Sequence, residues 1–269
     1  MTDTPQSRAP QGVDTNTAHS ARVWNYWLDG KDNYPVDREL GDLIASSHPR
    51  IVTDARAGRG FLTRVVTHMA EEEGIRQFLD IGTGLPTNNN THEVAQSVAP
   101  EARVVYVDND PMVLAHARAL LNSTEEGATA FIDADLRDTG KVLEAARELL
   151  DFDRPVGLTI LGTLGHITEY EAAIAIVREY TAACPSGSLL AIGDHVMPED
   201  PEAAAALRQW NEGAALPYRS HTREEFTAYF DGMEMLDPGV VPGTRWRTAE
   251  PEVGSIPDTD MWVATARKP

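Results

Sequence analysis

The sequence predicts an α/β fold: a doubly wound, mostly parallel sheet with helices on both faces and a helical extension at the N-terminus. Five short apolar runs recur along the middle of the chain, and a stretch with helical character separates each run from the next. This alternation favours parallel strands joined by right-handed crossovers. The chain has 269 residues, 42% of them hydrophobic, so it can bury one large core. We therefore expect a single globular domain over residues 18–269.

The first part of the chain is predicted to be a disordered tail followed by helices. Residues 1–17 are polar, contain two prolines, and lack the basic start and apolar run of a signal peptide. Ser20 can cap a first helix that ends near Asp29 and Gly30, and a second helix is expected over 35–44. Apolar residues at helical spacing from Phe61 to Met69 predict a third. Residues 18–76 would form the helical extension.

The five apolar runs predict strands at 77–81, 103–107, 129–132, 158–161 and 189–192. After the fifth run, residues 201–210 and 222–229 favour helices. Residues 233–236 and 261–266 are predicted to be the final strands and could pair as a hairpin with a long connection. The domain would therefore consist of a ligand-binding half, residues 77–196, and a second half, residues 197–269.

Composition excludes several classes of function. The 23 Lys and Arg residues against 42 Asp and Glu residues give a formal net charge of −19. A protein that grips phosphate backbones needs clustered basic residues, so nucleic acid is not expected as a partner. No apolar stretch approaches the length needed to cross a bilayer. The single cysteine, Cys184, allows no internal disulfide, which fits a reducing compartment, and we expect the cytoplasm.

No metal site is expected from sequence motifs. The chain has no HExxH motif, and His48, His68, His92 and His116 lie on helical or loop patterns without metal-ligand spacing. It also has no Walker loop, and its glycine-flanked segment at residues 162–165 lacks the nucleophilic serine of a hydrolase. The sequence leaves the oligomeric state open.

The stretch "FLDIGTGLPTNNNTHE", residues 78–93, is the strongest candidate for a ligand-binding turn. In open α/β sheets, ligands bind beyond the carboxyl ends of the strands, and the turn after the first strand is usually central. Gly82 and Gly84 allow tight backbone conformations there and leave room for a ligand to approach the main chain. Taken alone, the two glycines could equally serve strand-to-helix packing.

Three predicted strands in succession run into acidic residues, Asp80, Asp108 and Asp135. Asp108 lies 24 residues after Gly84, close to the distance of about 20 residues at which nucleotide-binding folds offer a carboxylate to ribose hydroxyls. Asp135 is placed to accept a hydrogen bond from an adenine amine, although either residue could be an ordinary loop aspartate. The series favours an adenosine-containing ligand.

The turn does not match a dinucleotide well. The third glycine of the dinucleotide fingerprint is replaced by Thr87, and Pro86 ahead of it removes an N–H donor. S-adenosylmethionine has no pyrophosphate and carries an ammonium, a carboxylate and a sulfonium. An acid at Asp80 beside the turn therefore suits S-adenosylmethionine better than a nicotinamide dinucleotide.

The segments "FLDIGTG", "VVYVDNDP" and "DADLRD" resemble, in order and spacing, the cofactor-binding segments of Rossmann-like S-adenosylmethionine-dependent methyltransferases. Within them, "ARVWNYWLDGKDNYPVDRE" followed by "QFLDIGTGLPTNNNTHEVAQ" resembles a bacterial family first catalogued as a domain of unknown function. The resemblance runs from about Ser20 onward. It implies a seven-stranded Rossmann-like sheet and S-adenosylmethionine as the cofactor. It places the following residues around that cofactor: Asp80, Gly82 and Gly84 at the methionine part, Asp108 at the ribose, and Asp135 and Leu136 at the adenine. Asn109, next to Asp108, is also expected to bind the cofactor.

The N-terminal segment is predicted to act as a lid. Arg22 and Tyr26 lie one helical turn apart on one face of the first helix, ahead of a polar loop. We expect this segment to fold over the strand ends and to touch the cofactor or the acceptor through these two side chains. The neighbouring Trp24 and Trp27 are instead expected to anchor the helix by packing.

The predicted activity is methyl transfer to a small-molecule acceptor, with residues 197–269 on the acceptor side. A general base could assist by removing a proton from the acceptor. His166 and His195 follow the fourth and fifth predicted strands and are the two candidates. His166 is preferred because its glycine-flanked loop adjoins the predicted position of the sulfur. The alternatives are a non-catalytic or regulatory S-adenosylmethionine-binding protein and an NAD-dependent oxidoreductase.

Overall fold

The structure is a computed structural model that describes residues 13–87, 89–120, 122–197, 201, 204–205, 217–249 and 256–269. Its centre is one sheet with the strand order β3-β2-β1-β4-β5-β8-β6, and β7 also pairs with β8. The bounds are β1 (Gln77–Ile81), β2 (Arg103–Asp108), β3 (Ala128–Asp133), β4 (Gly157–Leu161), β5 (Leu189–His195), β6 (Glu234–Met235), β7 (Val241–Pro242) and β8 (Met261–Arg267). The predicted doubly wound α/β fold is confirmed.

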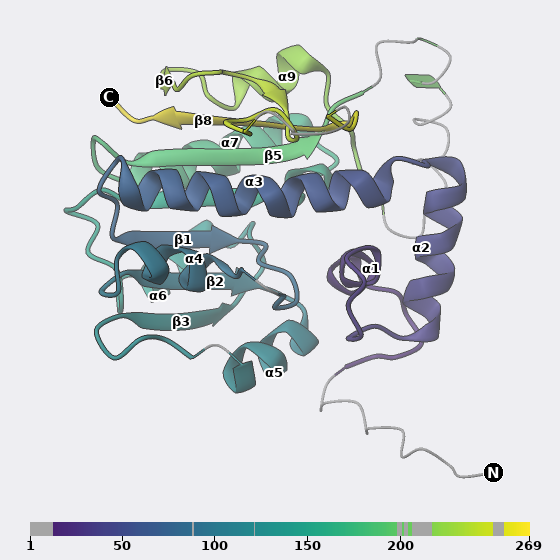
Figure 1. Ribbon diagram of the computed structural model, residues 1–269, viewed down its shortest axis with the longest axis horizontal. Helices are drawn as coiled ribbons and strands as arrows, with labels where there is room; N and C mark the ends of the chain where they lie inside the picture. Colours follow the sequence, from purple (N-terminus) through teal and green to yellow (C-terminus); the bar gives the residue numbers. More distant parts are fainter. Residues whose placement is uncertain are drawn as a thin grey trace.

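The first five strands are all parallel, as the alternation predicts. Strand β1 lies at the centre and is buried along its whole length, which explains the apolar residues Phe78, Leu79 and Ile81 in its sequence. Because the strands are parallel, their carboxyl ends meet at one edge of the sheet (Figure 1). The order of the strands reverses beside β1, from β2 on one side to β4 on the other. This switch point opens a crevice at the carboxyl ends.

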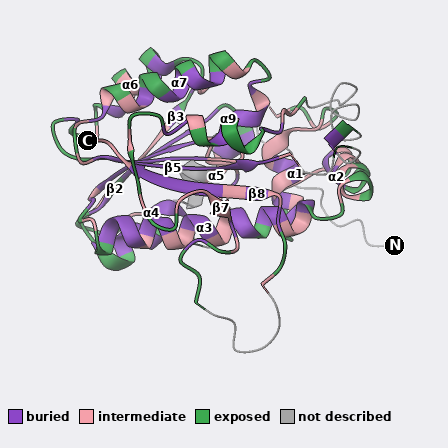
Figure 2. Cartoon of the chain, turned by 90° about the horizontal axis from the view of Figure 1, so that it is seen from above, coloured by how far each residue is buried: buried purple, intermediate pink, exposed green. Residues whose placement is uncertain are grey.

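Helices cover both faces of the sheet (Figure 2). One face carries α3 (Ile51–Glu71) and α4 (Thr91–Val98), and the other carries α6 (Thr139–Ala146) and α7 (Tyr170–Ala183). Side chains alternate between two buried apolar clusters: Phe78 packs in the cluster under α3, and Leu79 and Ile81 pack in the cluster under α7. The shorter helix α5 (Pro111–Leu120) lies near β3 at the edge of the sheet (Figure 1).

Strand β8 runs antiparallel to the first five strands. Strand β8 pairs with β5 along seven residues and also with β6 and β7. The predicted pairing of the final two strands is present as β6 with β8, and the extra strand β7 lies in the connection between them. The sheet therefore has eight strands where seven were predicted. Helix α9 (Arg223–Ala228) precedes β6 and is capped by Thr222 and Glu225 as predicted.

Two N-terminal helices, α1 (Ser20–Trp27) and α2 (Pro35–Ser47), lie beyond the carboxyl ends of the parallel strands (Figure 1). Helix α1 is capped by the side chain of His19 and not by Ser20, which is its first residue. Helix α3 begins ten residues earlier than the apolar spacing indicated, and its first turns hold α1 and α2 through Ile51 and Ala55. The helical extension thus overhangs the switch point.

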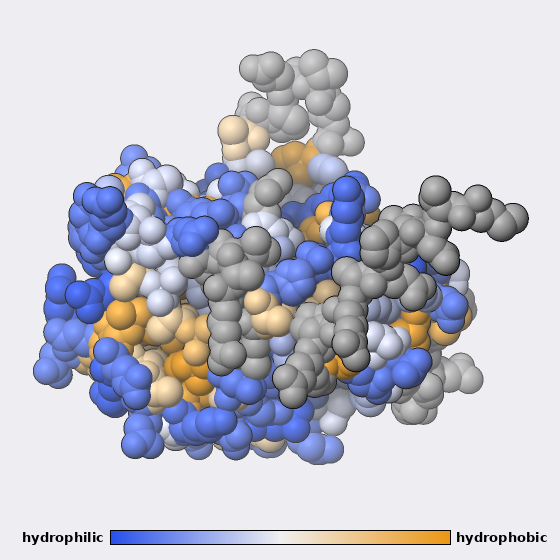
Figure 3. All heavy atoms as spheres, turned by 90° about the horizontal axis from the view of Figure 1, so that it is seen from below, coloured by the Kyte–Doolittle hydropathy of each residue, from blue (hydrophilic) through white to orange (hydrophobic). Residues whose placement is uncertain are grey.

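The described surface contains few large apolar side chains: only Leu43, Val98 and Met235 among the described residues are exposed, and they lie on different elements. Figure 3 shows one face, on which hydrophilic side chains surround smaller apolar areas. Within the described part of the chain, no helix is both long and apolar enough to cross a membrane. Residues 1–12 of the predicted tail over 1–17 and most of the predicted helix over 201–210 lie outside the described residues.

Candidate active site

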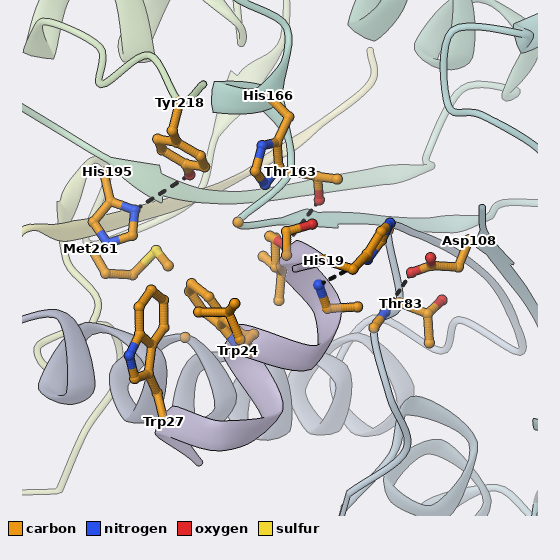
Figure 4. Close-up of a pocket in the computed structure, with 18 of the residues that line it drawn as sticks. His19, Trp24, Trp27, Thr83, Asp108, Thr163, His166, His195, Tyr218 and Met261 are labelled. Carbon is orange, nitrogen blue, oxygen red and sulfur yellow. Dashed lines mark hydrogen bonds between the residues drawn. The ribbon is translucent and has the colours of Figure 1, made fainter. Parts of the chain in front are cut away.

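A cavity of about 1390 Å³ opens at the carboxyl ends of the parallel strands, beneath α1. One part of its wall comes from the turns after β1, β2 and β3. The opposite part comes from α1, the α2–α3 connection, β5 and β8. Figure 4 shows the division: Asp108, Thr83 and His19 lie on one side, and Trp24, Trp27, His195 and Met261 on the other. We call these the strand-turn half and the aromatic half of the cavity.

The glycine turn after β1 forms the centre of the strand-turn half. Gly82 and Gly84 have φ angles of 72° and 69°, a region that side chains rarely adopt. A Cβ at Gly82 would lie 2.4 Å from the side chain of Thr163, whereas a Cβ at Gly84 would meet nothing within 4 Å. Gly82 therefore packs against the turn after β4, and Gly84 leaves open space in the cavity. Both glycines line the cavity.

Asp108 lies at the end of β2 and shapes the turn directly. Its Oδ2 accepts a hydrogen bond from the Gly84 N–H at 2.8 Å, and its Oδ1 accepts one from the Asp110 N–H at 2.9 Å. Burial raises the pKa of Asp108, and these two backbone donors partly offset that effect. Each carboxylate oxygen keeps a further lone pair, so Asp108 can still accept hydrogen bonds from a ligand.

The predicted adenine-binding residues follow β3 and also line the cavity. Asp135 accepts a hydrogen bond from the Arg137 N–H at 2.9 Å through Oδ1, and the Asn109 side chain approaches its Oδ2 at 3.5 Å. The carbonyl of Leu136 accepts a hydrogen bond from the Tyr180 hydroxyl at 2.8 Å, which ties this turn to α7. The structure thus brings Asp108, Asn109, Asp135 and Leu136 to one wall, as the sequence predicted.

Asp80 differs from the other two acids because it is almost fully buried at the cavity floor. Its Oδ2 accepts from the Thr91 hydroxyl at 2.6 Å and its Oδ1 from the Thr159 hydroxyl at 2.9 Å. Burial raises the pKa of Asp80, while these hydroxyls and the nearby positive charge of Arg59 favour its ionised form. Asp80 therefore holds the cavity floor together through its hydrogen bonds with Thr91 and Thr159.

Arg59 is a cavity residue that the sequence reading missed. It lies on α3, and its guanidinium donates to the Asn89 carbonyl at 3.1 Å. Burial lowers the pKa of Arg59, and the charge of Asp80 works in the opposite direction. The sequence signal that pointed to Arg59 was a basic residue on a helix whose apolar side chains recur at helical spacing. Only the tertiary arrangement shows that this residue faces the glycine turn.

Neither predicted lid residue lines the cavity. The buried Arg22 donates to the backbone carbonyls of Asp14 at 2.8 Å and Thr17 at 2.7 Å. Tyr26 is half-buried against α2 and donates to Asp42 at 2.8 Å. These two side chains therefore hold the N-terminal segment in place, and other residues of the same segment reach the cavity.

His19 and Trp24 are among the residues of the N-terminal segment that line the cavity. The Nδ1 of His19 lies 3.0 Å from a carboxylate oxygen of Asp110, two residues after Asp108. Burial works to lower the pKa of His19, but the Asp110 carboxylate outweighs it and raises that pKa. This contact fastens the start of α1 to the turn after β2.

The aromatic half has apolar walls with polar groups at defined positions. Trp24 packs edge-on against Trp27 with ring centroids 5.9 Å apart, and against His195 with centroids 6.3 Å apart. Met261 and Tyr218 complete the wall (Figure 4). Such surfaces bind flat apolar groups well, while a few polar side chains fix their orientation.

His166 points into the cavity from the turn after β4 (Figure 4). Its Nδ1 lies 3.3 Å from the carbonyl oxygen of Pro217 and its ring packs edge-on against Tyr218. A carbonyl can only accept, so Nδ1 carries the proton and Nε2 of the neutral ring keeps a free lone pair. Burial lowers the pKa of His166, which favours this neutral form at neutral pH.

His195, at the end of β5, has different surroundings. Its Nδ1 lies 3.3 Å from the hydroxyl of Tyr218, and that hydroxyl donates a short hydrogen bond to Asp194. Its Nε2 lies 3.4 Å from Oδ2 of Asp54 on α3. The sequence reading found His195 but missed Asp54 and Tyr218, because both come from segments distant in sequence. His195 is thus part of a buried polar cluster.

Comparison with known proteins assigns the chain to a family. Residues 6–269 match the model of the S-adenosyl methyltransferase family. A DUF574 family protein from Streptomyces avermitilis is 43% identical, with a TM-score of 0.89 over 95% of this chain and 99% of that one. A candidate methyltransferase from Thermobifida fusca is 37% identical, with a TM-score of 0.87 over 97% and 99% of the two chains.

More distant structures share the fold alone. The plantazolicin methyltransferase BpumL, solved with SAH, is 13% identical, with a TM-score of 0.50 over 93% of this chain and 95% of that one. No protein among the curated sequences matches the chain. The family match spans almost the whole chain, the two closely similar structures agree with it, and the strand ends carry the expected acids. The chain belongs to the S-adenosyl methyltransferase family, the DUF574 family, and its cofactor is S-adenosylmethionine.

Proposed function

We propose that the protein transfers a methyl group from S-adenosylmethionine to a small, flat and largely apolar acceptor bound in the aromatic half of the cavity. The size of the cavity is the observation that carries this proposal. Sites for a single drug-sized ligand occupy about 300–1000 Å³, and this cavity measures about 1390 Å³. It therefore has room for a cofactor and for a second small molecule.

The strand-turn half fits the cofactor. The open space at Gly84 lets an adenosyl group approach the main chain, and the free lone pairs of Asp108 can accept from both hydroxyls of a ribose. Asp135 and Asn109 stand beside that position and supply an acceptor and an amide for the adenine edge. This arrangement gives the predicted residues their roles in binding.

The methionine end of the cofactor would lie over Asp80 and Arg59. Arg59 offers a guanidinium for the carboxylate of the cofactor, and the negative charge of Asp80 favours its ammonium. Asp80 already accepts hydrogen bonds from Thr91 and Thr159. It therefore contributes mainly its negative charge and the fixed position of the cavity floor.

His166 is proposed as the general base. S-adenosylmethionine supplies a methyl group that is bonded to a positively charged sulfur. The acceptor attacks this methyl group in line with the carbon–sulfur bond, and the sulfur leaves as a neutral thioether. The residues of this chain align the acceptor with that methyl group and remove the acceptor proton. The free Nε2 of His166 can take this proton, and Nδ1–H stays on the Pro217 carbonyl to orient the ring. Helix α1 covers the site and excludes water.

A turnover experiment tests the proposal. Purified protein is incubated with S-adenosylmethionine and a low-molecular-weight metabolite extract, and formation of S-adenosylhomocysteine is followed. We expect product only when both extract and protein are present. The His166→Gln variant should lose about 100-fold or more of this rate with unchanged affinity for S-adenosylhomocysteine. His116→Gln, on α5 outside the cavity lining, is the matched control.

Two results would overturn the proposal. Tight cofactor binding without product from any extract fraction would identify a binding protein instead of an enzyme. If the His166→Gln variant is as active as the His116→Gln control, His166 is not the general base. The site would then contribute only by aligning the acceptor with the methyl group.

A further inference from the structure

A cluster of two histidines and two aspartates lies at the bottom of the aromatic half. His48 follows α2, Asp54 lies on α3, His195 ends β5, and Asp260 immediately precedes β8. His48, His195 and Asp260 line the cavity, and Asp54 lies fully buried behind them. Ligand atoms of His48, Asp54 and Asp260 all lie within 4.8 Å of one another. Three parts of the chain, around the start of α3, at the end of β5 and just before β8, thus meet in this cluster.

Asp54 directs one oxygen into this cluster and leaves it without a hydrogen bond. Its Oδ1 accepts from the Thr259 hydroxyl at 2.6 Å and from the Asp260 N–H at 2.9 Å. Its Oδ2 is buried and has no hydrogen-bond partner among the described residues. An unpaired buried carboxylate oxygen is costly, so this atom needs a positively charged neighbour.

The hydrogen bonds of His195 show what that neighbour could be. The Tyr218 hydroxyl donates its proton to Asp194 and can therefore only accept from Nδ1 of His195. In the neutral ring, Nε2 then carries a lone pair, and this lone pair faces Asp54 Oδ2 at 3.4 Å. Two lone pairs facing each other in a buried site repel unless a positive charge offsets them, either a proton on His195 or a metal ion on Asp54.

The distances in the cluster match the edges of a metal coordination sphere. His48 Nε2 lies 3.4 Å from Asp260 Oδ2 and 3.7 Å from Asp54 Oδ2. These separations are close to those of a tetrahedral zinc ion, whose bonds of about 2.0–2.1 Å place its ligand atoms about 3.3–3.4 Å apart. His195 contacts Asp54 at 3.4 Å but lies outside the group of three residues whose ligand atoms are mutually close. The Nε2 atom of His48 lacks a hydrogen-bond partner among the described residues, as a metal site requires.

We propose that His48, Asp54 and Asp260 bind a divalent metal ion of the zinc class. The imidazole nitrogen of His48 favours such an ion over Mg²⁺ or Ca²⁺, which prefer all-oxygen ligands. The two carboxylates balance the charge of the ion. The Thr259 hydroxyl and the Asp260 N–H both donate to Asp54 Oδ1 and supply the outer hydrogen bonds that typically orient a metal ligand.

The charges at the cluster also favour a cation, because carboxylate oxygens of Asp54 and Asp260 both face Nε2 of His48. Arg50 contacts the other oxygen of Asp260 at 3.3 Å and leaves Oδ2 directed at His48.

The competing account is a metal-free cluster in which protonated histidines neutralise the two aspartates. The Asp54→Asn variant separates the two accounts. The amide oxygen can keep the bonds from Thr259 and Asp260, and the amide N–H₂ can donate to Nε2 of a neutral His195. The variant should therefore fold, yet it loses the charged ligand that a metal needs.

The experiment uses untagged full-length protein freed of metal with a chelator. Zn²⁺ binding is measured by calorimetry, Co²⁺ binding by its visible absorption, and stoichiometry by native mass spectrometry. We expect one ion per chain in the wild type. Loss of a direct ligand in Asp54→Asn or His48→Gln should weaken binding by about 100-fold or more. His116→Gln, a histidine beside Asp32 and outside the cluster, should bind like the wild type.

Three outcomes would overturn the proposal. The wild type could take up neither Zn²⁺ nor Co²⁺ at micromolar concentrations, which supports the protonated cluster. Asp54→Asn and His48→Gln could bind as tightly as the His116→Gln control, which would identify an adventitious site elsewhere. Mg²⁺ or Ca²⁺ could bind where Zn²⁺ does not, which would refute the zinc class. Measuring S-adenosylhomocysteine affinity in the same variants separates these outcomes from a failure of the proposed methyl transfer.

Discussion

Replacing Asp108 by asparagine tests the proposed ribose contact. In the structure the Asp108 carboxylate accepts one backbone N–H on each oxygen and keeps a lone pair on each for a ligand. Asparagine has a single acceptor oxygen, so one ribose hydroxyl loses its charge-assisted acceptor. Such a bond contributes about 1.5–3 kcal/mol, and Asp108→Asn should therefore weaken S-adenosylhomocysteine binding roughly 10- to 100-fold.

The control for this variant is Asp133→Asn. Asp133 pairs in register with Asp108 at the same end of the neighbouring strand, but its side chain is exposed and does not line the cavity. Calorimetry at 25 °C should show wild-type affinity for Asp133→Asn. Asp108→Asn also places an amide group against one of two backbone donors, at a cost in stability of about 1–3 kcal/mol, which urea unfolding measures separately.

An analogue without the ribose 2′-hydroxyl makes the test specific. The wild type should bind 2′-deoxy-S-adenosylhomocysteine more weakly than S-adenosylhomocysteine, while Asp108→Asn should discriminate much less between the two. Such coupling identifies a direct interaction. If Asp108→Asn binds S-adenosylhomocysteine within threefold of the wild type, or discriminates between the two ligands as strongly as the wild type does, Asp108 does not hold the ribose.

Three further predictions concern catalysis and packing. The rate of turnover should fall as the pH decreases through a value below 6.5, because burial lowers the pKa of His166 and protonation removes the base; a rate that keeps rising well above neutral pH would contradict this. Gly84→Ala should cost about 1–2 kcal/mol of unfolding free energy because of its φ angle. Gly82→Ala should cost about 1–3 kcal/mol more, because its Cβ would also strike Thr163; equal urea midpoints would refute the clash.

The parallel part of the sheet was predictable because its strands are buried on both faces. The predicted strand at 77–81 has the bounds of β1, and 103–107 differs from β2 only by the final Asp108. Buried parallel strands appear in the sequence as uninterrupted apolar runs, which have few alternative explanations. Strand β7 was missed because it has two residues, one of them a proline, and owes its pairing to β8.

The same physics explains which site residues could be predicted. The glycines and the acids at the strand ends follow directly from the sheet, because their positions are fixed by the strands that precede them. Arg59 and Asp54 lie on a long helix whose apolar spacing reveals one buried face but does not reveal what that face meets. Arg22 and Tyr26 were correctly placed on a helix over the site, but their side chains point away from the cavity.

The histidine cluster shows the limit of motif spacing. Sequence motifs for metals depend on ligands that lie close together in the chain. His48 and Asp54 are near neighbours, but Asp260 joins them from the position just before β8. The absence of a motif therefore does not decide whether side chains able to bind a metal meet in space.

The central claim is that one cavity holds the adenosyl cofactor against the strand ends and leaves the aromatic half for the acceptor. A crystal structure of the protein with S-adenosylhomocysteine tests it most directly. The account predicts ribose hydroxyls hydrogen-bonded to Asp108, adenine beside Asp135, and the sulfur facing the His166 side of the cavity. A ligand bound in the aromatic half instead, or a strand-turn half without ligand at saturating concentration, would contradict it.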